Sequence, residues 1–140
     1  MDRASRPNPP LFDALDSGDM AAFKELLPLA DVNAPGQEGA SPLMSAARWG
    51  YLEAASMLLA CQGIDVNARA EDGSTALMLA ADAGGMEMLS LLMASPRIDL
   101  RAKDRLGCDA ARRAALAGHE GAAKAVKSRA AAAGKSSGAP

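Results

Sequence analysis

The sequence predicts an all-α solenoid of about four helix-turn-helix repeats with hairpin loops between them, and three observations support this prediction. The 140 residues are rich in alanine, leucine and methionine and include few aromatic residues, which favours closely packed helices. The pattern Gly-x-Ser/Thr-x-Leu-Met-x-Ala-Ala-x-x-Gly occurs at residues 39–50 and again at 73–84. At the same shift of 34 residues Gly73 aligns with Gly107, and such a fixed period is typical of stacked supersecondary units.

This period divides the chain into one repeat domain and two flanking segments. The repeats lie at about residues 9–35, 36–69, 70–103 and 104–129. The first repeat is imperfect, because Leu11 aligns with Leu43 at a shift of 32 rather than 34. We expect residues 1–8 to form a flexible N-terminus and the low-complexity residues 130–140 to form a disordered tail.

Each central repeat has the signals of two short helices. Ser41 can cap the first helix and Pro42 suits its first position, and Thr75 repeats the cap one period later. Gly50 can end this helix in a left-handed conformation. The second helix is expected at about residues 52–60. Helices of two turns are marginal alone, so neighbouring repeats must stabilise them.

The fourth repeat departs from the central ones. Ala111 stands where Leu43 and Leu77 stand, and Lys127 stands where Leu59 stands. A more polar outer face is what a terminal repeat needs for contact with water. Because it is also rich in alanine, we expect the fourth repeat to be the least stable part of the array.

These residues resemble the ankyrin-repeat family. Its D-x-x-G-x-T-P-L-H-x-A-A-x-x-G pattern corresponds to GQEGASPLMSAARWG from Gly36, AEDGSTALMLAADAG from Ala70 and a worn DRLGCDAARRAALAG from Asp104. Tetratricopeptide repeats share the period, but they lack the Gly-x-Thr-Pro-Leu cap and the Asp-Val-Asn hairpin. The resemblance covers about residues 9–129 and implies an ankyrin-type solenoid.

The family's histidine is replaced here by Met44, Met78 and Arg112. The hydrogen bonds that this histidine usually makes between repeats are therefore expected to be absent, and we expect looser tethering of the loops. The two methionines have two interpretations. They form either an adaptable binding stripe or part of the packed core, because methionine serves in both places.

No residue pattern indicates catalysis, a cofactor or a metal site, and we expect a non-enzymatic protein. His119, the only histidine, follows Gly118 at an expected helix start, with no carboxylate or nucleophile spaced around it. Cys61 and Cys108 lack metal-ligand spacing, so we expect reduced thiols buried as small hydrophobic groups. The GKSS sequence at 134–137 lacks the earlier glycine of a phosphate-binding loop.

The resemblance implies a protein–protein interaction module that acts as adaptor, scaffold or inhibitor. An unidentified protein or peptide would contact the concave face formed by the hairpin tips and the exposed sides of the inner helices. The implied partner-binding positions are Gln37, Glu38, Met44, Arg48, Trp49, Arg69, Glu71, Asp72, Ser74, Met78, Asp82, Lys103, Arg105, Leu106 and Arg112. Trp49 beside Arg48 is the sharpest candidate, because interfaces favour this pair as anchors. Packing of Trp49 against Tyr51 and the next repeat is the alternative.

The charge of the chain is unevenly distributed. Residues 1–100 carry a net charge of −8 and residues 101–140 a net charge of +6. An alternative function is therefore binding of nucleic acid or another anionic surface by the basic C-terminal segment, although no aromatic residues lie between the basic ones for base stacking. We expect a cytoplasmic monomer without membrane insertion, since no run is apolar enough to span a bilayer. A nuclear or exported protein stays open.

Overall fold

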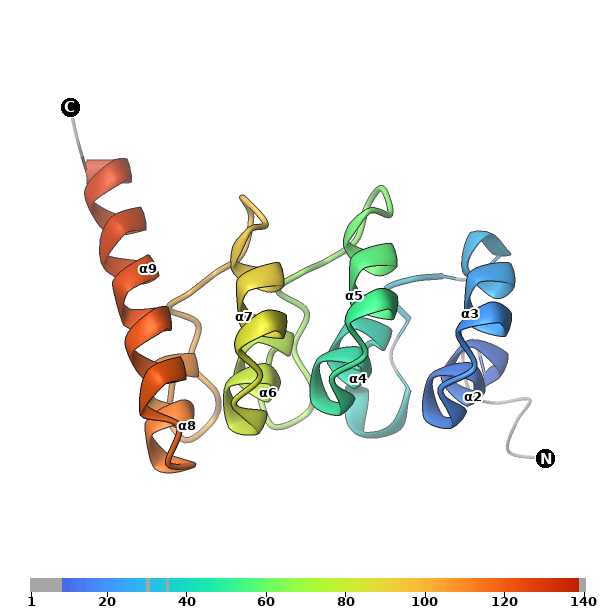
Figure 1. The fold of residues 1–140 in the computed structure, drawn as a ribbon, viewed down its shortest axis with the longest axis horizontal. Coiled ribbons are helices and arrows are strands. Elements are labelled where there is room, and N and C mark those ends of the chain that lie inside the picture. Colours follow the sequence, from blue (N-terminus) through green and yellow to red (C-terminus); the bar gives the residue numbers. More distant parts are fainter. Residues whose placement is uncertain (1–8, 30, 35, 139–140) are drawn as a thin grey trace.

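The computed structural model of the chain describes residues 9–29, 31–34 and 36–138, and these form a row of helix pairs (Figure 1). The α-helices are α2 (Pro9–Ser17), α3 (Met20–Leu26), α4 (Pro42–Trp49), α5 (Leu52–Leu59), α6 (Ala76–Ala83), α7 (Met86–Met93), α8 (Ala110–Leu116) and α9 (Glu120–Gly138). Two short 3₁₀ turns are η1 (Leu27–Leu29) and η2 (Gln37–Gly39). The predicted all-helical array of about four helix-turn-helix units is confirmed.

The helix pairs stack so that each contacts its neighbours in series. Helices α2, α4, α6 and α8 pack one against the next and form an inner row, and α3, α5, α7 and α9 form an outer row (Figure 1). Within each repeat the inner helix also packs against the outer helix that follows it. Every short helix therefore obtains from its neighbours the apolar contact that it cannot make alone.

The predicted helix ends are confirmed. The Ser41 hydroxyl accepts a hydrogen bond from the Met44 backbone N–H, and Thr75 does the same for Met78. Gly50 ends α4 with φ of 77°, a left-handed conformation in which glycine carries no Cβ penalty. The carboxylates of Asp19 and Asp109 cap α3 and α8 in the same way, although our sequence analysis had not assigned them.

The core lies between the two rows of helices. Its large buried side chains include leucines at equivalent positions of the central repeats, such as Leu43, Leu58, Leu77 and Leu92. Small alanines between them let the helices approach closely. Ala111 occupies the position of Leu43 and Leu77 in the last repeat and is also buried, so α8 contributes less apolar area than α4 or α6.

Asparagine side chains link the loops that follow the outer helices. The Asn33 amide donates to the Gly63 carbonyl at 2.7 Å, and its oxygen accepts the Asp65 N–H at 2.8 Å. Asn67, one period later, makes the same two bonds to Arg97 and Asp99, both at 2.8 Å. Each asparagine thus satisfies two backbone groups of the next loop. We call these four bonds the asparagine ladder.

A second set of bonds links the hairpin tips. The Glu71 N–H donates to the Glu38 carbonyl at 3.0 Å, and the Arg105 N–H donates to the Asp72 carbonyl at 3.1 Å. These tips are therefore joined directly through the backbone. Together with the asparagine ladder, they connect the central repeats at two separate places without the family's histidine.

The end of the chain differs from the disordered tail that we expected at residues 130–140. Helix α9 continues to Gly138, in keeping with the high helix propensity of its alanines. Arg129 donates to the Met93 carbonyl at 3.1 Å, and Arg101 donates to the Ala130 carbonyl at 2.9 Å, so the middle of α9 is attached to the preceding repeat. The predictions for residues 1–8 and 139–140 lie outside the described residues.

Candidate functional site

Three hollows lie in a row along the inner helices and the hairpin tips, and we call this row the inner groove. The first hollow, about 230 Å³, is lined by Phe12, Asp16, Glu38, Ala40, Met44, Ser45, Arg48, Trp49 and Leu79. The second, about 320 Å³, is lined by Glu38, Ala40, Arg48, Ala70, Glu71, Asp72, Ser74 and Leu79. The third, about 550 Å³, is lined by Asp72, Asp82, Asp104, Arg105, Leu106, Cys108, Arg113, Leu116 and Ala117. Neighbouring hollows share lining residues, so the three hollows adjoin one another from α2 to α8.

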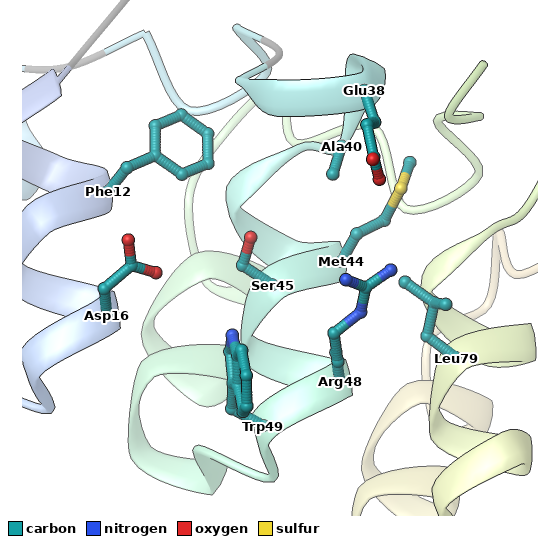
Figure 2. Close-up of a pocket in the computed structure, with 9 residues that line it drawn as sticks. All are labelled: Phe12, Asp16, Glu38, Ala40, Met44, Ser45, Arg48, Trp49 and Leu79. Atoms are coloured by element: carbon teal, nitrogen blue, oxygen red, sulfur yellow. The ribbon is translucent and has the colours of Figure 1, made fainter.

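The first hollow has an aromatic and acidic wall on its N-terminal side. Figure 2 shows Phe12 and Asp16 reaching in from α2, opposite Ser45 and Trp49 on α4. Trp49 is 59 % exposed, whereas Phe12 is buried. The alternative of a tryptophan packed against Tyr51 is therefore not what the structure shows. The indole stands at the edge of the groove, available to another molecule.

Carboxylates dominate the centre of the groove. Glu38 and Arg48 line both the first and the second hollow, and Glu71 and Asp72 join them in the second. The Asp72 carboxylate accepts the Ser74 backbone N–H at 3.0 Å. Hydrogen bonds from Ser74 and the charge of Arg113 hold the pKa of Asp72 below its usual value. Asp72 is thus charged over the whole physiological pH range.

A network of polar contacts around Arg113 stands beside the third hollow. Its guanidinium pairs with the Asp82 carboxylate, donates to the Ser74 hydroxyl at 2.6 Å and lies 3.4 Å from an Asp104 oxygen. Burial lowers the pKa of Arg113, but bonding to Asp82 and the charges of Asp82, Asp104 and Asp72 raise it more. Arg113 therefore connects α8 to α6 and to the hairpin tip of its own repeat, and it neutralises the acidic groups there.

Exposed leucines flank the third hollow. Leu106, at the tip of the last hairpin, is 88 % exposed, and Leu116, on α8, is 69 % exposed. Leu116 is equivalent to Arg48 and Asp82 at the 34-residue period, so that alignment could have identified it as a groove position. The groove therefore has an exposed indole near one end and exposed aliphatic groups near the other.

The structure brings about half of the predicted partner-binding residues together in the groove. The exposed or half-buried ones that line it are Glu38, Arg48, Trp49, Glu71, Asp72, Asp82, Arg105 and Leu106. Met44 and Ser74 also line the first and second hollows, but they and Met78 are at most 2 % exposed, so the three side chains are buried beneath the surface. The two methionines belong to the packed core. For the two methionines this is the second of the two interpretations given above.

The other predicted positions lie elsewhere. Arg69, Lys103 and Arg112 are exposed but do not line the three hollows, and Arg69 donates to the Lys103 carbonyl at 2.7 Å. The side chain of Gln37 is outside the described part of the structure. Our sequence analysis missed the groove residues Phe12, Asp16, Leu79, Arg113 and Leu116.

The single histidine and the two cysteines were the remaining side chains with possible reactivity. The His119 ring lies against Gly84, where an added Cβ would come within 2.7 Å of it. Both cysteines are free thiols; Cys108 is buried, and partial burial raises the pKa of the Cys61 thiol.

Residues 9–29, 31–34 and 36–138 contain no group of three or more His, Cys, Asp or Glu side chains that could hold a metal ion. In the same residues no helix has the length and apolarity to cross a membrane.

Paired short helices in two stacked rows, joined by bonded loops, define the class of the molecule as a helical repeat protein. The chain matches the family model described as ankyrin repeats (3 copies) over residues 2–70 and the model described as ankyrin repeat over residues 72–105. It therefore belongs to the ankyrin-repeat family, whose repeats are generally protein–protein interaction modules. The α8–α9 pair follows the matched residues and is placed as a further repeat by its packing. No curated protein matches the chain.

Proposed function

We propose that this chain is a non-enzymatic binding module that holds a segment of a partner protein in the inner groove. The observation that carries the proposal is the 59 % exposure of Trp49 at the wall of the first hollow. Tryptophan is well buried on average in folded proteins, and it is enriched among the residues that dominate interface energies. An exposed indole beside a hollow therefore has the character of an anchor for another molecule.

The shape of the array supports the same proposal. The three hollows share lining residues, so they adjoin one another along the inner helices, as an extended partner segment requires. Their walls belong to short helices held by core leucines and by bonds between successive loops. Such a surface is preorganised, and a partner that binds it does not have to order it first.

The alternative of an anionic partner on the basic C-terminal segment has weaker support. Arg113 is paired with Asp82, and Arg129 donates to the Met93 carbonyl, so two of its cationic groups are already used within the chain. Lys124 and Lys127 on α9 are exposed, without an aromatic neighbour for base stacking. This alternative predicts binding to duplex DNA that falls steeply with salt, and anisotropy of labelled DNA would measure it.

The experiment that tests the groove is affinity capture from the native cell extract with matched variants. We expect Trp49→Ala to reduce recovery of the specific partner at least tenfold, as is usual for a tryptophan that dominates the energy of an interface. Met86→Ala is the control, because Met86 is also exposed, at 46 %, but begins α7 in the outer row. Equal thermal midpoints of both variants would exclude misfolding. Recovery that survives Trp49→Ala, or that is lost equally with Met86→Ala, would contradict the proposal.

A further inference from the structure

We propose that the inner groove binds a segment of a partner protein rich in arginine or lysine, with one cationic side chain held between Trp49 and Asp16 in the first hollow. This inference rests on the proposed function, that the groove receives a protein segment, and adds the chemistry of that segment. It follows from the composition of the first hollow and from the charges along the groove.

The first hollow has the two features that a cationic side chain requires. The Trp49 indole comes from α4 and the Asp16 carboxylate from α2, and both are directed into the space between these helices (Figure 2). A cation is attracted to the face of an indole and forms strong hydrogen bonds with a carboxylate. A volume of about 230 Å³ is below that of typical small-molecule pockets but suits one long side chain.

The neighbouring charges extend this preference along the groove. Asp16, Glu38 and Glu71 line the first two hollows, and none of them forms an ion pair with another described residue. In the third hollow the situation is different, because Arg113 already pairs with Asp82 and Asp104. Uncompensated negative charge therefore lies between α2 and α6.

One cationic group, the Arg48 guanidinium, opposes this negative charge. Arg48 lines both of the first two hollows, and Figure 2 shows it on the side of Leu79, away from Asp16. This single positive charge is outnumbered by the carboxylates of Asp16, Glu38, Glu71 and Asp72, which line the same two hollows. An acidic segment would be repelled by this excess, and an apolar one would desolvate carboxylates without a partner, which is costly. A basic segment is the occupant that satisfies them.

The direct test uses the single tryptophan of the chain as a reporter. Trp49 gives the only indole N–H resonance of the protein, so a peptide that enters the first hollow must shift it. The probes are a peptide of alternating arginine and alanine, the same peptide with citrulline in place of arginine, and a third with glutamate. We expect the arginine peptide to shift the Trp49 resonance and to bind at least tenfold more tightly than the other two.

Charge variants sharpen the test, because two of them have opposite expected signs. Asp16→Asn should weaken binding of the arginine peptide about threefold, the size expected for one exposed ion pair. Arg48→Gln should strengthen it about twofold, because it removes the opposing cation. Glu87→Gln is the matched control, since Glu87 is exposed on α7 in the outer row and should leave the affinity unchanged.

The outcomes separate this inference from the proposed function. Three results would each overturn the inference that the groove binds a basic segment. These are equal or absent binding of the three peptides, an unshifted Trp49 resonance, and weaker binding of the arginine peptide by Arg48→Gln. None of these results would affect partner capture that depends on Trp49, so the proposed function would then stand without this partner chemistry. Loss of that dependence on Trp49 would remove the proposed function itself.

Discussion

The junction between α4 and α6 and the junction between α6 and α8 solve the same packing problem in different ways. Ser45, Leu79 and Arg113 occupy one position in successive repeats. Leu79 is 8 % exposed and lines the first two hollows with its apolar side chain. Arg113 instead extends from α8 to Asp82 on α6 and replaces apolar contact with ionic contact.

This difference follows from the composition of the two neighbouring helices. Helix α6 contributes Leu77 and Met78 to the core, whereas α8 has Ala111 and the exposed Arg112 at the same positions. With less apolar area to bury, the last repeat gains hydrogen bonds to charged groups, each of which contributes about 1.5–3 kcal/mol. A repeat can thus keep its place in the stack with a weaker core if a polar network supports it.

The largest expected effect on stability comes from placing an alanine in the third repeat at the position where the fourth repeat already has one. Leu77→Ala removes a fully buried side chain and should lower the free energy of unfolding by about 3 kcal/mol. Urea unfolding followed by circular dichroism measures this change. Leu116→Ala is the control, because Leu116 is 69 % exposed and its loss should cost less than about 0.5 kcal/mol. Similar costs for the two variants would refute the assignment of the core.

The next largest effect on stability comes from making the junction between α6 and α8 resemble the junction between α4 and α6. Arg113→Leu restores the residue type of Leu79 but leaves Asp82 and Asp104 without their cation, and we expect a loss of about 2 kcal/mol. Hydrogen exchange should accelerate mainly in α8 and α9. The exposed neighbour provides the control variant, Arg112→Leu, with a change below about 0.5 kcal/mol. Unchanged exchange in α8 would show that the polar network does not hold this repeat.

A smaller effect distinguishes two equivalent glycines. Gly50 and Gly84 both have left-handed φ, 77° and 70°, so alanine at either should cost about 1 kcal/mol. A Cβ at Gly50 meets open space, whereas one at Gly84 would lie 2.7 Å from the His119 ring. We expect Gly84→Ala to cost about 1 kcal/mol more than Gly50→Ala in thermal unfolding, as in other overpacked sites. Equal costs would mean that His119 moves aside freely.

The smallest expected effect is a dependence of the unfolding free energy on pH. The pKa of Asp72 is lowered from 3.8 in the folded chain by hydrogen bonds from Ser74 and by Arg113, so the folded state binds a proton less readily than the unfolded state. This contribution to stability is present above pH 3.8 and disappears as the pH falls through the lower folded value. The difference in unfolding free energy between the wild type and Asp72→Asn should therefore shrink below pH 3.8. It is small, because Asp72 is exposed and screened by solvent, and a constant difference would contradict the assignment.

The sequence alone predicted the array and its helix ends, because these depend on local signals that recur with the period. The Ser41 and Thr75 caps and the left-handed Gly50 are determined by a few neighbouring residues. The length of α9 was not predicted, because residues 130–138 have a low-complexity composition that also suits a disordered segment.

The candidate groove was predicted only in part. Trp49 and Glu38 were assigned to the concave face from their position in the repeat, but their neighbours Phe12 and Asp16 were missed because the first repeat is imperfect. Arg112 was assigned in place of Arg113, although Arg113 is the residue in the position of Leu79. Which of two adjacent arginines turns back to Asp82 depends on contacts between repeats, and a single repeat contains no signal for it.

The asparagine ladder has a mechanical consequence. Because Asn33 and Asn67 each tie one loop to the next, a tensile load applied at the two ends of the array falls on these links as well as on the packed helices. Units connected only to their nearest neighbours can then rupture one at a time instead of together. Stretched in an optical trap, the chain should lengthen in discrete steps, with the unit clamped by Arg113 giving its own characteristic rupture force.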